Sequence, residues 1–144
     1  MKALVDTNVI VDALTSREPW KESAEKIFLM AANQVMDAYI TASSATDIYY
    51  LVRKYLHSTE QAKQVVGKLY SLMGILAVTK DECLDALASA VSDYEDAVVE
   101  RTAAKADMDY IITRNVKDYQ NGMVKAILPD EFIILMEDGQ AFCF

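Results

Sequence analysis

The sequence predicts an α/β fold of three layers (α/β/α), in which a central parallel sheet of about five strands lies between two layers of helices. Two observations predict it. Short apolar runs recur along the chain, and the segments between them carry apolar residues at helical spacing. Strands that alternate with helices, with connections long enough for crossovers, are typical of a parallel sheet covered on both faces.

Five short apolar runs are the expected strands. Their residues are apolar at successive positions rather than at alternate ones, which is the pattern of strands buried on both faces. Strand 1 is central in this prediction, because ligand sites in such sheets form where the strand order reverses. The runs are residues 3–5, 38–40, 75–78, 110–112 and 124–128.

Helices are expected between these runs. From residue 24 onwards, and again over residues 62–73, apolar residues three and four positions apart form stripes that face a core. Thr79 or Lys80 is expected to open a helix that ends near Val91, and Asp93 to cap a helix that runs towards Ala106. Pro129, followed by two acids, is the expected first turn of a last helix.

Composition narrows the class of protein. A chain of 144 residues, 53% of them hydrophobic, is expected to form a single domain over residues 1–144. No apolar run approaches a membrane span or a secretory signal, so we expect a cytoplasmic protein in which Cys83 and Cys143 are reduced thiols. The net charge of -8 argues against a general DNA-coating protein. A nuclease remains open, because metal ions invert the field of clustered acids.

Two acids follow the first two expected strands. Asp6 comes directly after the first strand, where a carboxylate is aimed into the crevice at the strand end. Asp47 lies about one turn inside the helix that follows the second strand. Taken singly, Asp6 or Asn8 serves equally well as a helix cap, and Asp47 as a first-turn acid that complements the helix dipole.

Two further polar segments come later in the chain. At the helix start near residue 93, Asp93 is expected to cap, Glu95 to face water and Asp96 to face the crevice. The loop after the fourth strand can bind phosphate and metal together, although an ordinary surface turn is the alternative. Its polar residues are Thr113, Arg114, Asn115, Lys117 and Asp118.

The four segments are more informative together than singly. Three or four carboxylates at the strand ends of one parallel sheet would repel strongly unless cations neutralised them. Ligands that are all oxygen favour Mg²⁺ or Mn²⁺. Such sites activate water for in-line attack on a phosphodiester and stabilise the leaving oxygen.

The residues of these segments resemble, in order and spacing, the acidic motifs of PIN-domain proteins. The matching segments are Asp6-Thr7-Asn8, residues 44–50, Tyr94-Glu95-Asp96-Ala97 and residues 113–119. The resemblance runs from Leu4 to residues 129–132. It implies a Rossmann-like fold and a metal-dependent endoribonuclease that cleaves single-stranded or structured RNA. In bacteria such a protein is often the VapC-type toxin of a type II toxin-antitoxin pair, frequently a homodimer.

The resemblance also implies site residues. The family's acidic quartet, catalytic and metal-ligating, matches Asp6, Asp47, Asp96 and Asp118. The second acid is usually Glu, so Asp47 is one methylene shorter and is expected to ligate through water. The last acid sometimes stands where this chain has Asn115, so either Asn115 or Asp118 supplies the last ligand. The expected substrate contacts are Asn8, Thr113, Arg114, Asn115 and Lys117.

Other functions have less support in the sequence. A haloacid-dehalogenase-type phosphatase needs a second Asp two residues after the first, where this chain has Asn8. The four scattered glycines form no phosphate-binding loop. The remaining alternative is a catalytically weak PIN-like module that binds RNA or protein, which cleavage with Mn²⁺ and its loss with EDTA would exclude. The expected partners are RNA, an antitoxin protein and a second copy of the chain, which would dock through Tyr49, Tyr50, Leu51 and Tyr55.

Overall fold

A computed structural model describes residues 1–141 and has one parallel sheet of five strands. The strand order is β3-β2-β1-β4-β5, and every neighbouring pair is parallel. The prediction of a five-stranded parallel sheet with its first strand at the centre is therefore confirmed. The strands are β1 (Lys2–Val5), β2 (Asp37–Thr41), β3 (Gly74–Leu76), β4 (Tyr110–Ile112) and β5 (Lys125–Ile127).

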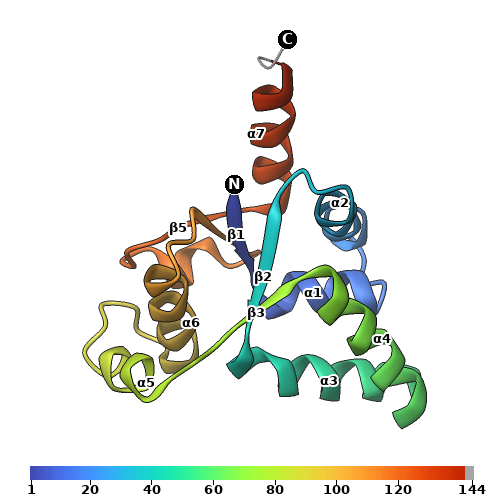
Figure 1. Ribbon diagram of the computed structural model, residues 1–144, viewed down its shortest axis with the longest axis horizontal. Coiled ribbons are helices and arrows are strands. Elements are labelled where there is room, and N and C mark those ends of the chain that lie inside the picture. The colour runs from blue at the N-terminus through green and yellow to red at the C-terminus, as the bar shows by residue number, and fades with distance from the viewer. Residues whose placement is uncertain (142–144) are drawn as a thin grey trace.

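Helices cover both faces of this sheet, so the three-layer prediction is also confirmed (Figure 1). One layer holds α1 to α4, and the opposite layer holds α5 and α6. The helices are α1 (Thr7–Leu14), α2 (Lys21–Ala32), α3 (Ala42–Leu56), α4 (Thr59–Leu72), α5 (Lys80–Ala86), α6 (Tyr94–Lys105) and α7 (Pro129–Ala141), with a 3₁₀ helix η1 (Val116–Tyr119).

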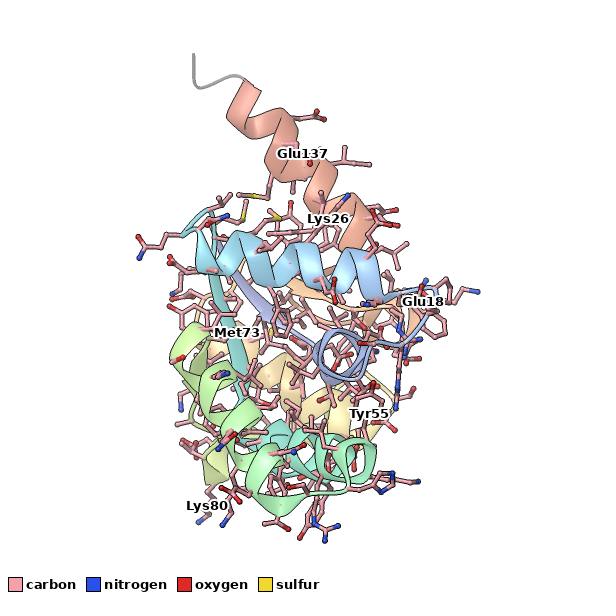
Figure 2. All side chains as sticks on the ribbon, turned by 90° about the vertical axis from the view of Figure 1, so that its right-hand side faces the viewer. Glu18, Lys26, Tyr55, Met73, Lys80 and Glu137 are labelled. Carbon is pink, nitrogen blue, oxygen red and sulfur yellow. The ribbon has the colours of Figure 1, made fainter. Side chains whose placement is uncertain are left out.

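The central strand supplies residues to the core on both of its faces. Ala3 and Val5 pack with the layer of α1 to α4, while Leu4, between them, packs with Val99 of α6 on the other face. Figure 2 shows side chains filling the space between the first layer and the sheet, with Met73 buried there and Lys80 at the surface. Burial on both faces explains why β1 is apolar at successive positions.

The ends of β1 and β4 lie side by side. Val5 pairs with Ile112, and the Asp6 backbone N–H donates to the Ile112 carbonyl at 2.9 Å. Asp6 and Thr113 therefore each follow the last paired residue of two neighbouring parallel strands, as predicted. The order reverses here, since the chain runs from β1 outwards to β3 and then returns to β4. This edge is where parallel α/β sheets bind ligands.

Three elements are shorter than predicted, and the first is β5, which spans Lys125–Ile127 rather than residues 124–128. β3 ends at Leu76, because Thr79 and Glu82 form the cap of α5 shortly afterwards. β3 is an edge strand, and its Ile75 is 44% exposed. α5 ends at Ala86 rather than near Val91, and the Ser89 hydroxyl accepts from the Val91 N–H. Such local side-chain bonds compete with helical ones.

Two expectations from composition can be compared with the structure. In the described part of the chain, no helix combines the length and the apolar character needed to cross a membrane. Cys83 is a free, half-buried thiol, and Cys143 lies outside the described residues.

Candidate active site

Asp6 stands at the end of β1 and caps α1. Its Oδ1 accepts from the Thr7 N–H at 2.8 Å, while its Oδ2 accepts from the Thr113 hydroxyl at 2.8 Å and from Asn8 Nδ2 at 3.3 Å. Burial raises the pKa of Asp6, and the bonds from Thr113 and Thr7 lower it in part. Asp6 is therefore a helix cap and, in the same geometry, a carboxylate held in place by its neighbours.

Asp96 lies in the first turn of α6, which Asp93 caps as predicted by accepting from the Asp96 N–H at 3.0 Å. Burial, together with the charges of Asp6 and Asp93, raises the pKa of Asp96 to about 6. Asp6 and Asp96 line the same pocket, although 90 positions separate them in the sequence. Glu95 is exposed, as expected, and also lines this pocket.

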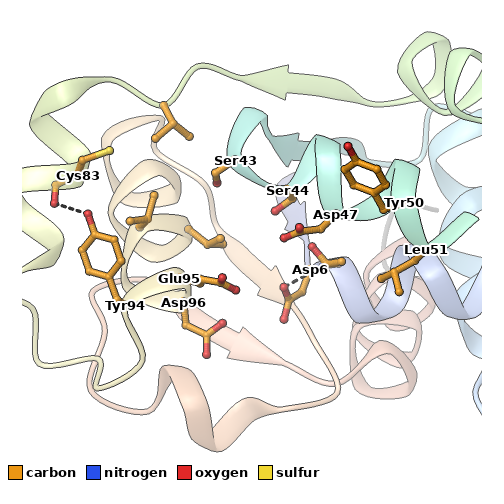
Figure 3. A pocket seen from close by; sticks show the side chains of 14 residues that line it. Asp6, Ser43, Ser44, Asp47, Tyr50, Leu51, Cys83, Tyr94, Glu95 and Asp96 are labelled. Atoms are coloured by element: carbon orange, nitrogen blue, oxygen red, sulfur yellow. Dashed lines mark hydrogen bonds between the residues drawn. The ribbon is translucent and has the colours of Figure 1, made fainter.

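Two pockets meet at Asp6 and Asp96, which line both of them. The larger pocket, of about 590 Å³, is also lined by Asp47, and Figure 3 shows Asp6 and Asp47 side by side with Asp96 across the pocket. The second pocket, of about 360 Å³, is also lined by Asn115 and Asp118. The fold thus brings the four predicted acids and Asn115 to one edge of the sheet.

The donor set fits a hard divalent cation. The four predicted acids offer carboxylate oxygens and Asn115 offers an amide oxygen, and oxygen ligands are those that Mg²⁺ and Mn²⁺ prefer. Like charges crowd one another here, since Asp118 raises the pKa of Asp6 and both raise that of Asp96. Within the described residues, no three acidic, histidine or cysteine side chains are yet gathered closely enough to enclose an ion. Asp6 and Asp96 are the central pair, with Asp47 and Asp118 on opposite sides.

The loop after β4 is tied to the site by its first residues. Thr113 is buried; its hydroxyl donates to Asp6 and accepts from the Asn115 N–H at 3.0 Å. Asn8 Oδ1 accepts from the Arg114 N–H at 3.4 Å. Of the predicted substrate contacts, Thr113 and Asn8 therefore hold Asp6 and the loop.

The two predicted cationic contacts, Arg114 and Lys117, do not line the two pockets of Asp6 and Asp96. The Arg114 guanidinium binds the buried carboxylate of Asp12 and lies 3.8 Å above the centre of the Trp20 ring. Lys117 is exposed and lines a different pocket, beside Asn115 and Asp118. Arg114 therefore faces α1 and α2, whereas Lys117 lies at the surface next to Asp118.

The sequence analysis missed Tyr119 and Asp12. Tyr119 is only 2% exposed, and its hydroxyl donates to Asp96 Oδ1 at 3.3 Å and also lowers the pKa of Asp6. Burial and the charges of Asp6 and Asp96 raise the pKa of Tyr119 above its usual range, so the hydroxyl keeps its proton. One sequence does not distinguish it from seven other tyrosines. Asp12 had a signal, an acid within an apolar helical stretch, which requires a buried partner.

The chain matches a known family over a range that includes most of this site. A family model described as the PIN domain matches residues 2–117, a range that includes Asp6, Asp47 and Asp96 and ends one residue before Asp118. No curated protein sequence matches the chain.

Solved structures share the fold at low sequence identity. VapBC2 from Rickettsia felis, bound to a DNA fragment from their promoter, is 16% identical, with a TM-score of 0.65 over 89% of this chain and 98% of that one. VapC20 of Mycobacterium tuberculosis, a sarcin-ricin loop cleaving toxin, is 13% identical, with a TM-score of 0.65 over 85% and 97%. VapBC-1 from nontypeable Haemophilus influenzae is 16% identical, with a TM-score of 0.64 over 90% and 99%.

Proposed function

Because the chain belongs to the PIN-domain family, we propose that it is a metal-dependent endoribonuclease whose acids hydrolyse RNA phosphodiesters. The observation that carries the proposal is the pairing of Asp6 and Asp96 at the point where the strand order reverses. Each carboxylate lines both pockets, and the charge of Asp6 raises the pKa of Asp96. Two crowded carboxylates open to solvent are suited to share divalent cations.

The residues of the site have distinct roles in this proposal. Asp6 and Asp96 would hold Mg²⁺ or Mn²⁺, with Asp47 on one side and Asp118 or Asn115 on the other. When bound, such a cation activates water and stabilises the charge on the leaving oxygen. Thr113 and Asn8 orient Asp6 by donating to its Oδ2, so this carboxylate keeps one geometry while substrate enters.

The charge of the pocket makes cations necessary for RNA to enter. The lining of the larger pocket includes four carboxylates, Asp6, Asp47, Glu95 and Asp96, and the residues described there include neither lysine nor arginine. A phosphodiester would be repelled by these acids until cations reversed the local field. Lys117, exposed next to Asp118, is the cation we propose for contact with the RNA backbone.

We further propose that the protein is the toxin of a toxin-antitoxin pair. The structural neighbours named VapBC2, VapBC-1 and VapC20 support this role by their shared fold. Copurification of the chain with the product of an adjacent short reading frame, and loss of its ribonuclease activity on binding, would test it.

A homodimer through α3 is proposed from its exposed aromatic residues. Tyr50 is 66% exposed and Tyr55 51%, on the surface of the same helix. Tyr50 and Leu51 also line the pocket of Asp6, so a partner on this face would sit beside the site. Light scattering that shows a monomer at tens of micromolar, an approximate range for weak association, would contradict the dimer.

The second candidate function is a module that binds RNA or protein without cleaving it. Two observations favour it. Among the described residues, no three acidic, histidine or cysteine side chains lie close enough together to hold one metal ion. The side chain of Asp47, one methylene shorter than the family's usual glutamate, also favours this second function. Metal-dependent cleavage separates the two functions.

The test is cleavage of a mixed RNA pool by the wild-type protein. We expect cleavage with Mn²⁺ or Mg²⁺, none with EDTA, and recovery when Mn²⁺ is restored in excess. A protein that binds RNA but leaves the pool intact at every Mn²⁺ concentration would support the binding module instead. Cleavage that persists in EDTA would show that a different group acts.

A further inference from the structure

The ring of Tyr119 is fixed by the core independently of its hydroxyl. Tyr119 ends η1 and packs in a cluster with Leu4 of β1, Val99 of α6 and Ile111 of β4. Only 2% of the residue is exposed. Because apolar residues of three elements hold the ring, its hydroxyl oxygen has a fixed position next to Asp96.

The hydroxyl reaches Asp96 from the buried side. It donates to Oδ1 at 3.3 Å, and Asp96 also lines both open pockets. A carboxylate has about four lone-pair positions, so one buried donor leaves others free for a ligand in the pocket. Asp6 is held in a comparable way by the hydroxyl of Thr113 at 2.8 Å.

We propose that Tyr119 is a positioning residue for cation binding, which holds Asp96 at the spacing from Asp6 that a shared ion requires. The inference rests on the proposed function, because it concerns the cations of that same site. Partners that orient a metal ligand through its remaining atoms typically change metal affinity by 10- to 100-fold, an order-of-magnitude range. Tyr119 would thus act on the ion through Asp96, without touching the ion itself.

Tyr119→Phe isolates the hydroxyl, because phenylalanine fills the same space in the core. The control is Tyr110→Phe, which removes a hydroxyl from a half-buried ring that lies edge-on to Phe132, at the other end of β4 from Thr113. The measurement is titration calorimetry with Mn²⁺ alone, in the absence of RNA. Melting temperatures without metal are recorded for all three proteins.

We expect Tyr119→Phe to bind Mn²⁺ roughly 10-fold more weakly or worse, and Tyr110→Phe to match the wild type. If the variant is too unstable for calorimetry, its stabilisation by Mn²⁺ relative to its own metal-free melting temperature gives the same comparison. Equal Mn²⁺ affinity in Tyr119→Phe and the wild type would overturn the inference and leave the proposed function standing. A wild type that binds no Mn²⁺ would overturn both.

Discussion

Arg114 holds Asp12 with two hydrogen bonds, from Nε to Oδ2 at 2.7 Å and from Nη2 to Oδ1 at 3.3 Å. Asp12 is buried in α1, and Arg114 belongs to the loop after β4. The same guanidinium covers the Trp20 ring at the start of α2. This contact ties the loop that carries Asn115 and Asp118 to the helix that Asp6 caps.

Arg114→Ala is expected to destabilise the fold strongly. Removal of one partner of a buried ion pair typically costs about 3–5 kcal/mol, because the other charge remains buried. Arg114→Lys should recover only part of this loss, since an ammonium group cannot bind both oxygens in the same plane. Urea unfolding measures both variants. Lys63→Ala, at an exposed lysine of α4, is the control and should stay within about 0.5 kcal/mol of the wild type. A similarly small change for Arg114→Ala would contradict a stabilising role for the ion pair of Arg114 and Asp12.

The metal-free protein should lose stability as the pH rises from about 4 to about 6. The pKa of Asp96 is raised from 3.8 to about 6, so in this window the folded state binds more protons than the unfolded state. Melting temperatures across the window measure the effect, and Asp96→Asn should make the profile shallower, because only the contributions of Asp6 and Asp12, whose pKa values burial also raises, would remain. Glu82, whose pKa Lys105 and Thr79 together lower to about 2, has the opposite effect, but only between that value and its usual 4.5. A profile that is equally steep in Asp96→Asn would contradict this origin.

Metal binding should show the opposite dependence on pH. A cation requires charged carboxylates, so Mn²⁺ competes with the proton that Asp96 holds below a pKa of about 6. We expect the apparent Mn²⁺ affinity to rise between pH ~5 and ~7 and then to level off. Calorimetry at fixed ionic strength measures it, and an affinity that does not change over this range would show that Asp96 is not a ligand.

Gly122→Ala should destabilise the protein, whereas Gly67→Ala should not. A Cβ at residue 122 would lie 2.7 Å from Cγ of Glu100, a residue that is itself buried, so the clash has little room to relax. Overpacking of this kind typically costs about 1–3 kcal/mol. Gly67 lies within α4 with open space around it, and alanine there should stabilise the helix by roughly 0.5–1 kcal/mol. Equal melting temperatures for the two variants would contradict the close packing of residue 122 on α6.

The sequence predicted the sheet and the edge that carries the acids. Buried strands such as β1 and β4 have apolar residues at successive positions, and this pattern located them within one or two residues. The edge strand β3 and the end of α5 were less predictable, because Thr79, Glu82 and Ser89 form local bonds that compete with regular structure.

The surroundings of the acids were harder to predict than the acids themselves. The motif residues follow strand ends, which the order of elements brings together. Arg114 looks like a phosphate contact in the sequence, but its direction depends on the distant Asp12 and Trp20. The hydroxyl of Tyr119 reaches Asp96 only through the packing of η1 against α6. Such contacts depend on tertiary geometry that spacing along one chain does not encode.

The most direct test of the acid site compares Asp6→Asn with Asp37→Asn in Mn²⁺-dependent RNA cleavage. Both variants lose one negative charge, but Asp6 lies at the acid cluster while Asp37 is exposed at the opposite end of the sheet, where β2 begins. Asparagine still caps helices well, so α1 should stay folded, as circular dichroism would verify. We expect Asp6→Asn to lose cleavage and Asp37→Asn to retain it. Wild-type cleavage by a well-folded Asp6→Asn protein would contradict the account.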